Sequence, residues 1–476
     1  MSYSVTQNTA FLTAASILQK VISFAYFTLI ARFIGVGNTG QYFLAITFTT
    51  IFTVIADFGL GPVLTREAAK YPEKSEQYVN TLLWTKIIFG IGAYGLVILF
   101  VNLLKYPDAV KTLVYLSGVT MWFDNLQSVF YSIFRARKNL IYESIGIIGS
   151  QFLTLLIGTT ALFMRASMLW LIAAYTIPSA INVMYAGYFL RRRYALKYAL
   201  VWDKTVFRSF ITIAIPFAIA GIVGRLYSYT DSIIMSKMLT HEHVGWWSVA
   251  YKITFAFGFI PAALSASVYP AMSSATISEP AKLAELFERS WSYLFMIVAP
   301  LSVGLAAVAK PVIITLYGEA YLPSVLLLQI LLISLVFGYL SFITGALLNA
   351  TNHQKTQTGL LIGALVSSIA LNFLLLPIIG TAGAAIAAVV GNFILCCGGF
   401  YFSRKIVAFN GKHIITQFLR SGIPAVIMGI FAYYASQFIH FSAVIAISAM
   451  LYAGLLFVTK ALSRAILTEM IQKVRV

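Results

Sequence analysis

Six charged residues interrupt long apolar stretches of the sequence, and they are the side chains best suited to do chemistry. They are Lys20, Arg225, Lys252, Asp57, Asp124 and Asp231. A charge inside a membrane costs about 2.5–3.5 kcal/mol on insertion scales, so a retained charge suggests a role in function. Cations at such positions can bind an anionic group such as a phosphate, and a carboxylate can carry a proton.

Two of the cations lie near the middle of their apolar stretches, and small polar residues surround both. Ser16 and Ser23 flank Lys20 at helical spacing, and Ser228 lies one turn from Arg225. We therefore expect both side chains to face a cavity that binds substrate. The alternative is a structural ion pair, since a snorkelling side chain does not suit a mid-helix position.

The other charges leave several interpretations open. Lys252 lies in the outer part of its stretch, where it either snorkels or joins the cavity. Asp231 lies six residues after Arg225, about 120° around a helix, so it either pairs with Lys252 or binds a substrate or coupling ion. Asp57 lies at a bend, where a cap or salt bridge is as good an explanation as transport. Asp124 is central, and Lys86 is interpreted as interfacial.

These residues need a membrane-spanning scaffold to position them. The chain has 476 residues, of which 60% are hydrophobic and 10% charged, with a mean hydropathy of +0.87. Soluble domains are about one quarter charged, so this composition excludes an ordinary soluble enzyme and a disordered chain. We predict an all-α polytopic membrane protein with about 14 transmembrane helices. Their expected limits are 10–34, 42–64, 82–104, 112–134, 144–164, 168–190, 209–236, 246–271, 290–315, 323–349, 357–378, 382–402, 414–437 and 441–460.

The basic residues orient these helices. If the N-terminus is cytoplasmic, 22 of the 33 Lys and Arg residues fall in cytoplasmic loops or the C-terminal tail, and six fall in outer loops. This asymmetry predicts that both termini are cytoplasmic, and it explains the net charge of +18 without nucleic acid. The adjacent Cys396 and Cys397 and the scattered histidines have no metal-site spacing.

An internal repeat indicates two lobes. A shift of 205 residues places Lys20 on Arg225 and Gly40 on Gly245, and an even number of helices per repeat makes the repeat parallel. We predict two pseudo-symmetric six-helix lobes followed by two C-terminal helices. The expected divisions are an N-lobe at 1–190, a basic cytoplasmic linker at 191–208, a C-lobe at 209–403, and the last two helices with the tail at 404–476.

Several segments resemble a known family. They are Leu29–Gly35, Gly40–Ala45, Ile55–Leu60, Thr65–Ala69, Asp231–Ile234 and Val244–Lys252. The chain resembles, over essentially its whole length, the polysaccharide-biosynthesis flippases of the Wzx type. These belong to the multidrug/oligosaccharidyl-lipid/polysaccharide superfamily.

The resemblance implies a cell-membrane flippase. It would move an undecaprenyl-pyrophosphate-linked oligosaccharide from the cytoplasmic to the outer leaflet by alternating access, for O-antigen, capsule or exopolysaccharide assembly. Lys20, Arg225 and Lys252 would line a cationic cavity, and Asp57, Asp124 and Asp231 are candidates for an ion pair or for coupling to H⁺ or Na⁺. No cofactor is implied. The polymerase and glycosyltransferases of the same pathway are candidate partners.

Two other classes of protein remain alternatives. A multidrug or cation antiporter of the same superfamily would usually have twelve spans and an acidic cavity. A membrane enzyme of the pathway would need a large outer loop or an acidic catalytic cluster. The sequence shows neither pattern.

Overall fold

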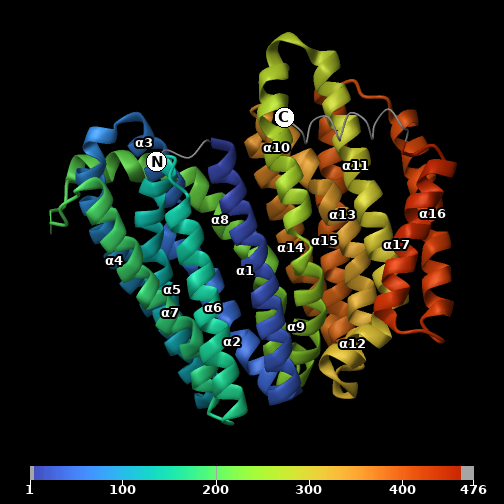
Figure 1. The fold of residues 1–476 in the computed structure, drawn as a ribbon, viewed down its shortest axis with the longest axis horizontal. Helices are drawn as coiled ribbons and strands as arrows, with labels where there is room; N and C mark the ends of the chain where they lie inside the picture. The colour runs from blue at the N-terminus through green and yellow to red at the C-terminus, as the bar shows by residue number, and fades with distance from the viewer. Residues whose placement is uncertain (1–4, 200, 463–476) are drawn as a thin grey trace. The chain divides into compact units, whose positions relative to one another are not determined.

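The computed structural model of the protein describes residues 5–199 and 201–462, and within these residues every regular element is a helix (Figure 1). Two short 3-10 helices are η1 (Pro72–Lys74) and η2 (Glu319–Tyr321). The α-helices are α1 (Val5–Ile34), α2 (Val36–Asp57), α3 (Leu60–Lys70), α4 (Ser75–Leu103), α5 (Asp108–Ala136), α6 (Ile141–Phe163), α7 (Met168–Tyr194), α8 (Lys204–Met238), α9 (His241–Ala256), α10 (Phe259–Ser278), α11 (Pro280–Ala307), α12 (Ala309–Tyr317), α13 (Ser324–Ala350), α14 (Gln354–Ile379), α15 (Thr381–Ile406), α16 (Gly411–Ala435) and α17 (Phe441–Val458).

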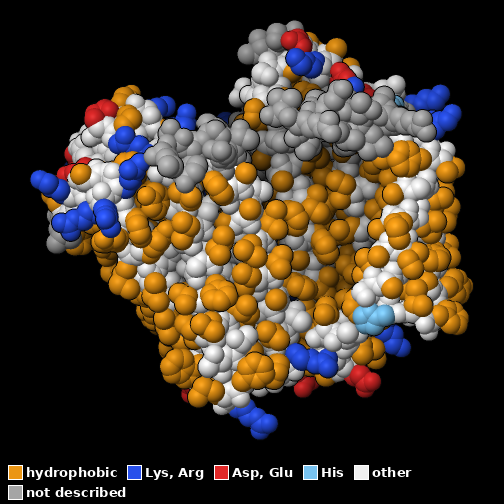
Figure 2. Space-filling model, in the orientation of Figure 1, with side chains coloured by type: hydrophobic (Ala, Val, Ile, Leu, Met, Phe, Trp, Pro, Cys, Tyr) orange, Lys and Arg blue, Asp and Glu red, His pale blue; other side chains and the backbone are white. Residues whose placement is uncertain are grey.

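The all-α membrane fold predicted from the sequence is confirmed. Thirteen helical segments of the described chain are long and apolar enough to cross a membrane. The remaining predicted span, 112–134, corresponds to α5, which is not among these thirteen. It has 29 residues but carries more polar side chains, Asp124 and Asn125 among them. Exposed apolar side chains cover the sides of the helices, and Lys and Arg side chains lie toward their ends (Figure 2). Such a surface suits lipid contact.

Three predicted spans are each divided into two helices. The span at 42–64 breaks after Asp57, where Phe58 and Gly59 both have a positive φ, 49° and 69°. The left-handed conformation ends α2, and α3 begins at Leu60. The span at 246–271 divides into α9 and α10 beside Gly258, and the span at 290–315 divides into α11 and α12 at Val308. The first break matters most for function because it positions Asp57.

The described residues form two compact units, one ending at Gly245 and the other beginning at Trp246. In the first unit α2 packs on α4, α5 and α8, while α1 packs on α6. The division differs from the predicted linker at 191–208 because α8 contacts α2, α3 and α4. The lobe limits 1–190, 209–403 and 404–476 derive from the sequence repeat and stay a prediction.

The segment between α7 and α8 is tied to α4. The Asn80 side-chain amide donates to the carbonyl oxygen of Lys197 at 3.1 Å and accepts from the backbone N–H of Ala199 at 3.1 Å. Asp203 caps α8 by accepting from the N–H of Val206, and this hydrogen bond lowers the pKa of the half-buried Asp203 carboxyl. The described residues on either side of position 200 in the predicted linker are therefore held by hydrogen bonds.

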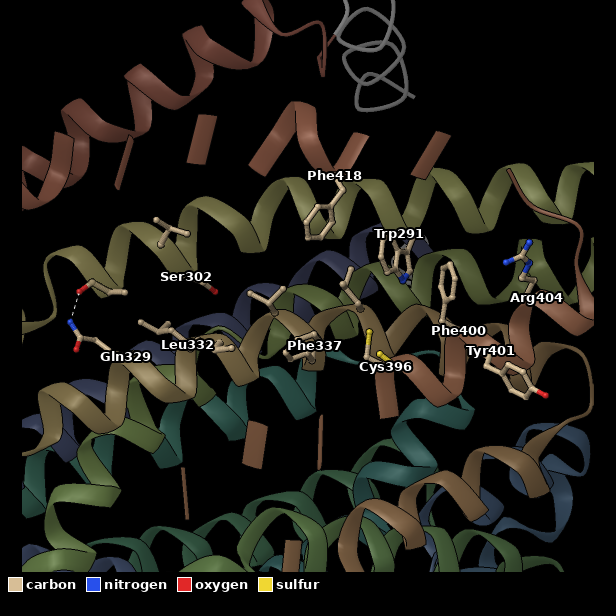
Figure 3. Close-up of a pocket in the computed structure, with 16 residues that line it drawn as sticks. Trp291, Ser302, Gln329, Leu332, Phe337, Cys396, Phe400, Tyr401, Arg404 and Phe418 are labelled. Carbon is tan, nitrogen blue, oxygen red and sulfur yellow. Dashed lines mark hydrogen bonds between the residues drawn. The ribbon is translucent and has the colours of Figure 1, made fainter. Parts of the chain in front are cut away.

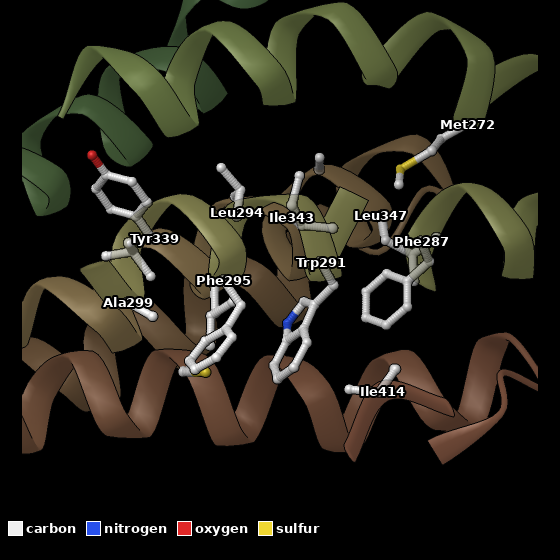
Figure 4. Close-up of a cluster of buried hydrophobic side chains, with 14 of the residues drawn as sticks. Met272, Phe287, Trp291, Leu294, Phe295, Ala299, Tyr339, Ile343, Leu347 and Ile414 are labelled. Atoms are coloured by element: carbon white, nitrogen blue, oxygen red, sulfur yellow. The ribbon is translucent and has the colours of Figure 1, made fainter. Parts of the chain in front are cut away.

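An aromatic core joins α10, α11, α13 and α16 in the second unit (Figure 4). Trp291 and Phe295 of α11 point toward α16, and the Phe295 ring stacks on Phe418 with centroids 3.7 Å apart. The Tyr339 hydroxyl donates to the carbonyl oxygen of Phe257 at 2.8 Å. The Phe295–Phe418 contact belongs to the packing of α11 on α16, which attaches α16 to the rest of the unit.

Gly40 and Gly245, which the 205-residue shift aligns, lie at one close approach between α2 and the start of α9. A Cβ on Gly40 would overlap the backbone carbonyl of His241, and a Cβ on Gly245 would overlap that of Val36. Gly40→Ala is therefore expected to destabilise the purified protein by about 1–3 kcal/mol, because a backbone must move. The matched change Gly92→Ala in α4 meets open space and should leave the melting temperature unchanged or higher. Equal melting temperatures for the two variants would contradict this packing account.

Candidate functional site

The end of α2 carries a buried ion pair. The Lys86 ammonium of α4 lies 2.5 Å from a carboxylate oxygen of Asp57 and donates a second hydrogen bond, also 2.5 Å, to the Ser128 hydroxyl of α5. The Lys86 side chain is 1% exposed and that of Asp57 is 29% exposed. The pair therefore joins α2, α4 and α5 just before the break at Phe58, as the ion-pair interpretation of Asp57 anticipates.

The prediction that Lys86 is interfacial is wrong. The span was expected to begin at residue 82, but α4 begins at Ser75, so Lys86 lies about three turns inside the helix. The residues from Ser75 to Thr81 are helical, and Asn80 and Thr81 among them are both less than 10% exposed. In the sequence, Ile87 and Ile88 directly follow Lys86. This apolar context was the available indication that Lys86 is buried.

A cavity of about 450 Å³ opens beside this ion pair. It is lined by residues of α2, α3, α8 and the α2–α3 break, namely Val54, Asp57, Gly59, Pro62, Phe217, Gly221, Gly224, Arg225 and Ser228. Glycines allow the two sides to approach: a Cβ on Gly221 would lie 2.9 Å from Val54 Cγ1, and one on Gly59 would lie 2.8 Å from Phe217 Cβ. The cavity thus belongs entirely to the first unit.

The charges around this cavity favour an anion. Arg225 is exposed and Asp57 is half-buried, and among the described residues they are the only charged side chains in the lining. Because Lys86 already compensates Asp57, the three charges sum to one positive charge, carried by Arg225. A guanidinium in a weakly screened site binds phosphate-like groups through paired hydrogen bonds.

The remaining predicted cations lie elsewhere. Lys20 has an exposed side chain on α1, which packs on α6 and α2 and contributes no residue to the lining of the Arg225 cavity. Lys252 lies in α9, half-buried, and belongs to the second unit. The structure therefore brings Arg225 and Asp57 together in one cavity, and it leaves the roles of Lys20 and Lys252 as predictions.

The two other carboxylates have different surroundings. Asp124 of α5 accepts hydrogen bonds from the Ser179 hydroxyl of α7 at 2.7 Å and from the Gln127 amide at 3.2 Å. Ser179 directly follows Pro178, which lies inside α7, so Asp124 is linked to a proline-containing turn. Asp231 of α8 is buried, with 6% of its surface exposed, and it does not line the Arg225 cavity. Residues 5–199 and 201–462 contain no cluster of His, Cys, Asp and Glu that could hold a metal ion.

The sequence analysis missed two cavities of the second unit. The larger, of about 680 Å³, lies among α11, α13, α15 and α16, and its walls are mostly apolar (Figure 3). Trp291, Phe337 and Phe400 line it, Arg404 lies toward one end, and Gln329 donates to the Ala306 carbonyl oxygen at 3.1 Å. A second cavity, of about 550 Å³, lies among α10, α13 and α14. The spacing of residues in the sequence does not predict these cavities, because their walls combine helices that are distant in sequence.

The chain is similar to proteins of polysaccharide biosynthesis. The family described as "Polysaccharide biosynthesis protein" matches residues 5–276. The capsular polysaccharide biosynthesis protein CapF of Staphylococcus aureus is 21% identical over 405 residues, covering 84% of this chain and 99% of CapF. A putative O-antigen transporter of Shigella flexneri is 22% identical over 376 residues, covering 75% and 88% of the two chains. The solved structure of the lipid II flippase MurJ, in an inward closed conformation, matches with a TM-score of 0.76 at 16% identity and covers 94% of this chain and 98% of MurJ.

Proposed function

This chain belongs to the polysaccharide biosynthesis protein family, and on that premise we propose that it is a flippase for a lipid-linked glycan. Its substrate is an undecaprenyl-pyrophosphate-linked oligosaccharide, which it moves from the cytoplasmic to the outer leaflet of the cell membrane by alternating access. The product serves assembly of a surface polysaccharide. One observation of this structure supports the proposal most directly: among the described residues that line the cavity beside α2 and α8, Arg225 carries the single uncompensated charge.

The pyrophosphate is the part of such a substrate that this cavity suits. Moving a dianion out of water costs far more than moving a sugar, so the transporter must supply compensating cations. Arg225 can donate two parallel hydrogen bonds to phosphate oxygens. Lys86 holds the Asp57 carboxylate, which would otherwise repel the phosphates or pair with Arg225. Lys20 and Lys252 are proposed as further cations along the path.

The hydrocarbon part of the substrate suits the apolar cavity of the second unit. Its aromatic and aliphatic walls, from Trp291 to Phe418, offer a polyprenyl chain surroundings similar to lipid. Arg404 lies among its lining residues, and a basic side chain at an apolar cavity suits a ligand that joins hydrocarbon to phosphate. This cavity thus suits the polyprenyl part of a lipid-linked substrate.

Asp124 or Asp231 is proposed to couple transport to H⁺ or Na⁺, because the Asp57 carboxylate is already paired with Lys86. Asp124 receives its hydrogen bonds from neutral donors, and such a carboxylate can exchange an ion without breaking an ion pair. Glycosyltransferases that build the glycan and a polymerase that consumes it are the proposed partners. No cofactor is required by this mechanism.

Depletion of the protein in its host cell tests the proposed function. Lipid-linked glycan should accumulate and stay protected from a membrane-impermeant oxidant, periodate, in intact cells, while surface polysaccharide declines. Re-expression of the wild-type chain should reverse both changes. Normal surface polysaccharide after complete depletion, in a cell with no second flippase gene, would contradict the proposal.

The direction of transport depends on the predicted orientation, with both termini cytoplasmic. Ile379→Cys, at the end of α14 and 44% exposed, is expected to react with an impermeant maleimide added outside intact cells. Lys355→Cys, exposed at the opposite end of α14, should react only after lysis. Gly380 is a poorer position because its φ of 60° strains any other residue. Cys397→Ser removes the exposed native thiol, and the reverse labelling pattern would show the orientation to be inverted.

A further inference from the structure

The second cavity of the second unit has a chemistry unlike that of the other two. It measures about 550 Å³ and lies among α10, α13 and α14, near the turn that joins α13 to α14. Its polar groups are the hydroxyls of Ser265, Ser341 and Tyr269 and the side-chain amides of Asn349 and Gln357. Among the described residues, no Lys, Arg, Asp, Glu or His side chain lines it. The site is therefore polar and uncharged.

Its amides are available to a ligand. Within the described residues, the side chains of Asn349, Gln357 and Tyr269 make no hydrogen bond to the protein, and all three are accessible. Tyr269 is 41% exposed. Elsewhere in the helical bundle polar side chains mostly bond to the preceding turn of their own helix, as Ser341 does to Gly338 at 2.7 Å. Three unengaged polar groups thus converge on one cavity.

A glycine sets the position of one amide. A Cβ on Gly345 of α13 would lie 3.1 Å from Nε2 and 3.4 Å from Cδ of Gln357 of α14. The Gln357 amide therefore lies directly against the Gly345 backbone, with no side chain between the two helices at that point. Ala262, Ala266 and Ala346 keep the neighbouring walls small.

We propose that this cavity binds an uncharged sugar residue of the lipid-linked glycan. The inference rests on the proposed flippase function and adds the class of group that this part of the protein recognises. Each amide offers both a donor and an acceptor, so Asn349 and Gln357 can each bond neighbouring sugar hydroxyls. The Tyr269 ring and the exposed ring of Phe342 offer flat apolar faces for the C–H side of a pyranose. Neither a phosphate nor a cationic drug finds a counter-charge here.

The two polar cavities differ in the chemical group that each one suits. The Arg225 cavity binds the pyrophosphate, which all such carriers share. The α10–α13–α14 cavity recognises the sugar, which differs among glycans. A site built to hydrogen-bond hydroxyls rejects ligands that lack them, because its amides would otherwise stay unpaired. Changes at Asn349 and Gln357 should accordingly alter selectivity among glycans rather than transport as such.

The test uses the full-length protein in liposomes with two fluorescent substrates. One is the lipid-linked glycan extracted from cells depleted of the protein, and the other is the same undecaprenyl-pyrophosphate carrier bearing only the first sugar. Gln357→Ala and Asn349→Ala are expected to slow the complete glycan about tenfold, the loss of roughly one hydrogen bond. Transport of the one-sugar carrier should stay within about twofold of wild type.

Two glycine variants provide a matched pair. Gly345→Ala in α13 displaces the Gln357 amide and should reproduce in part the selective effect of Gln357→Ala, while Gly359→Ala in α14 meets open space and should have no effect. Gln357→Glu keeps the side-chain size and should also slow the complete glycan selectively. Equal slowing of both substrates, or of neither, in the Asn349 and Gln357 variants would overturn the inference. Failure of the wild-type protein to move either substrate would instead reject the flippase function itself.

Discussion

Arg225→Ala is expected to lower transport of the lipid-linked glycan by roughly one to two orders of magnitude, the effect of losing charge-assisted hydrogen bonds to a phosphate. Surface polysaccharide in cells that express only this variant should become undetectable. Arg225 is exposed in its cavity, so its removal should leave the amount and melting temperature of the protein close to wild type.

Two variants isolate the charge of Arg225. Arg225→Lys keeps the charge but loses the paired hydrogen bonds, so an intermediate amount of surface glycan is expected. Arg208→Ala removes an exposed arginine from the same helix, outside the cavity, and should export normally. Normal export by Arg225→Ala, measured as cell-surface glycan at equal protein level, would reject the anion-binding role.

Lys86→Met is expected to have the largest effect on stability. It leaves the Asp57 carboxylate, 29% exposed, without its partner, and breaking a buried pair from one side costs about 3–5 kcal/mol. Partial exposure of Asp57 favours the lower end of that range, about 3 kcal/mol. The uncompensated carboxylate should also attract Arg225 across the shared cavity and slow transport.

The double variant Asp57→Asn with Lys86→Met separates pairing from simple loss of lysine. Removing both charges should recover most of the melting temperature and most of the transport, since no unpaired charge remains. The melting temperatures of the wild type, Asp57→Asn, Lys86→Met and the double variant form a complete double-mutant cycle. A double variant no more stable than Lys86→Met alone would mean that the pair is not the source of the effect.

Much of the fold follows from the sequence because membrane helices are local. Runs of apolar residues long enough to cross a bilayer must be helical, since lipid offers no other partner for the backbone. The exact limits of the helices were harder to predict from the sequence. The break after Asp57 depends on Phe58 adopting a positive φ, which Gly59 and Pro62 suggest without specifying. The early start of α4 at Ser75 was missed because its first turns are polar.

The candidate site could be predicted only in part. Residue type and depth were enough to select Arg225 and Asp57, which share a cavity in the structure. The partner of Asp57 was not predictable, because Lys86 lies 29 residues away and reaches it only through the packing of α4 on α2. Uncharged cavities such as that of Asn349 and Gln357 escape any search that starts from charge. The suggested pairing of Asp231 with Lys252 stays a prediction.

Transport by the purified protein tests the central claim most directly. Liposomes would contain the protein and a fluorescent undecaprenyl-pyrophosphate-linked glycan, and an impermeant quencher would report the fraction in each leaflet over time. Wild-type protein and Arg208→Ala are expected to equilibrate the two leaflets, while Arg225→Ala and protein-free liposomes do not. Equal rates for Arg225→Ala and the wild type, or no movement with the wild type, would contradict a flippase that binds its substrate through the Arg225 cavity.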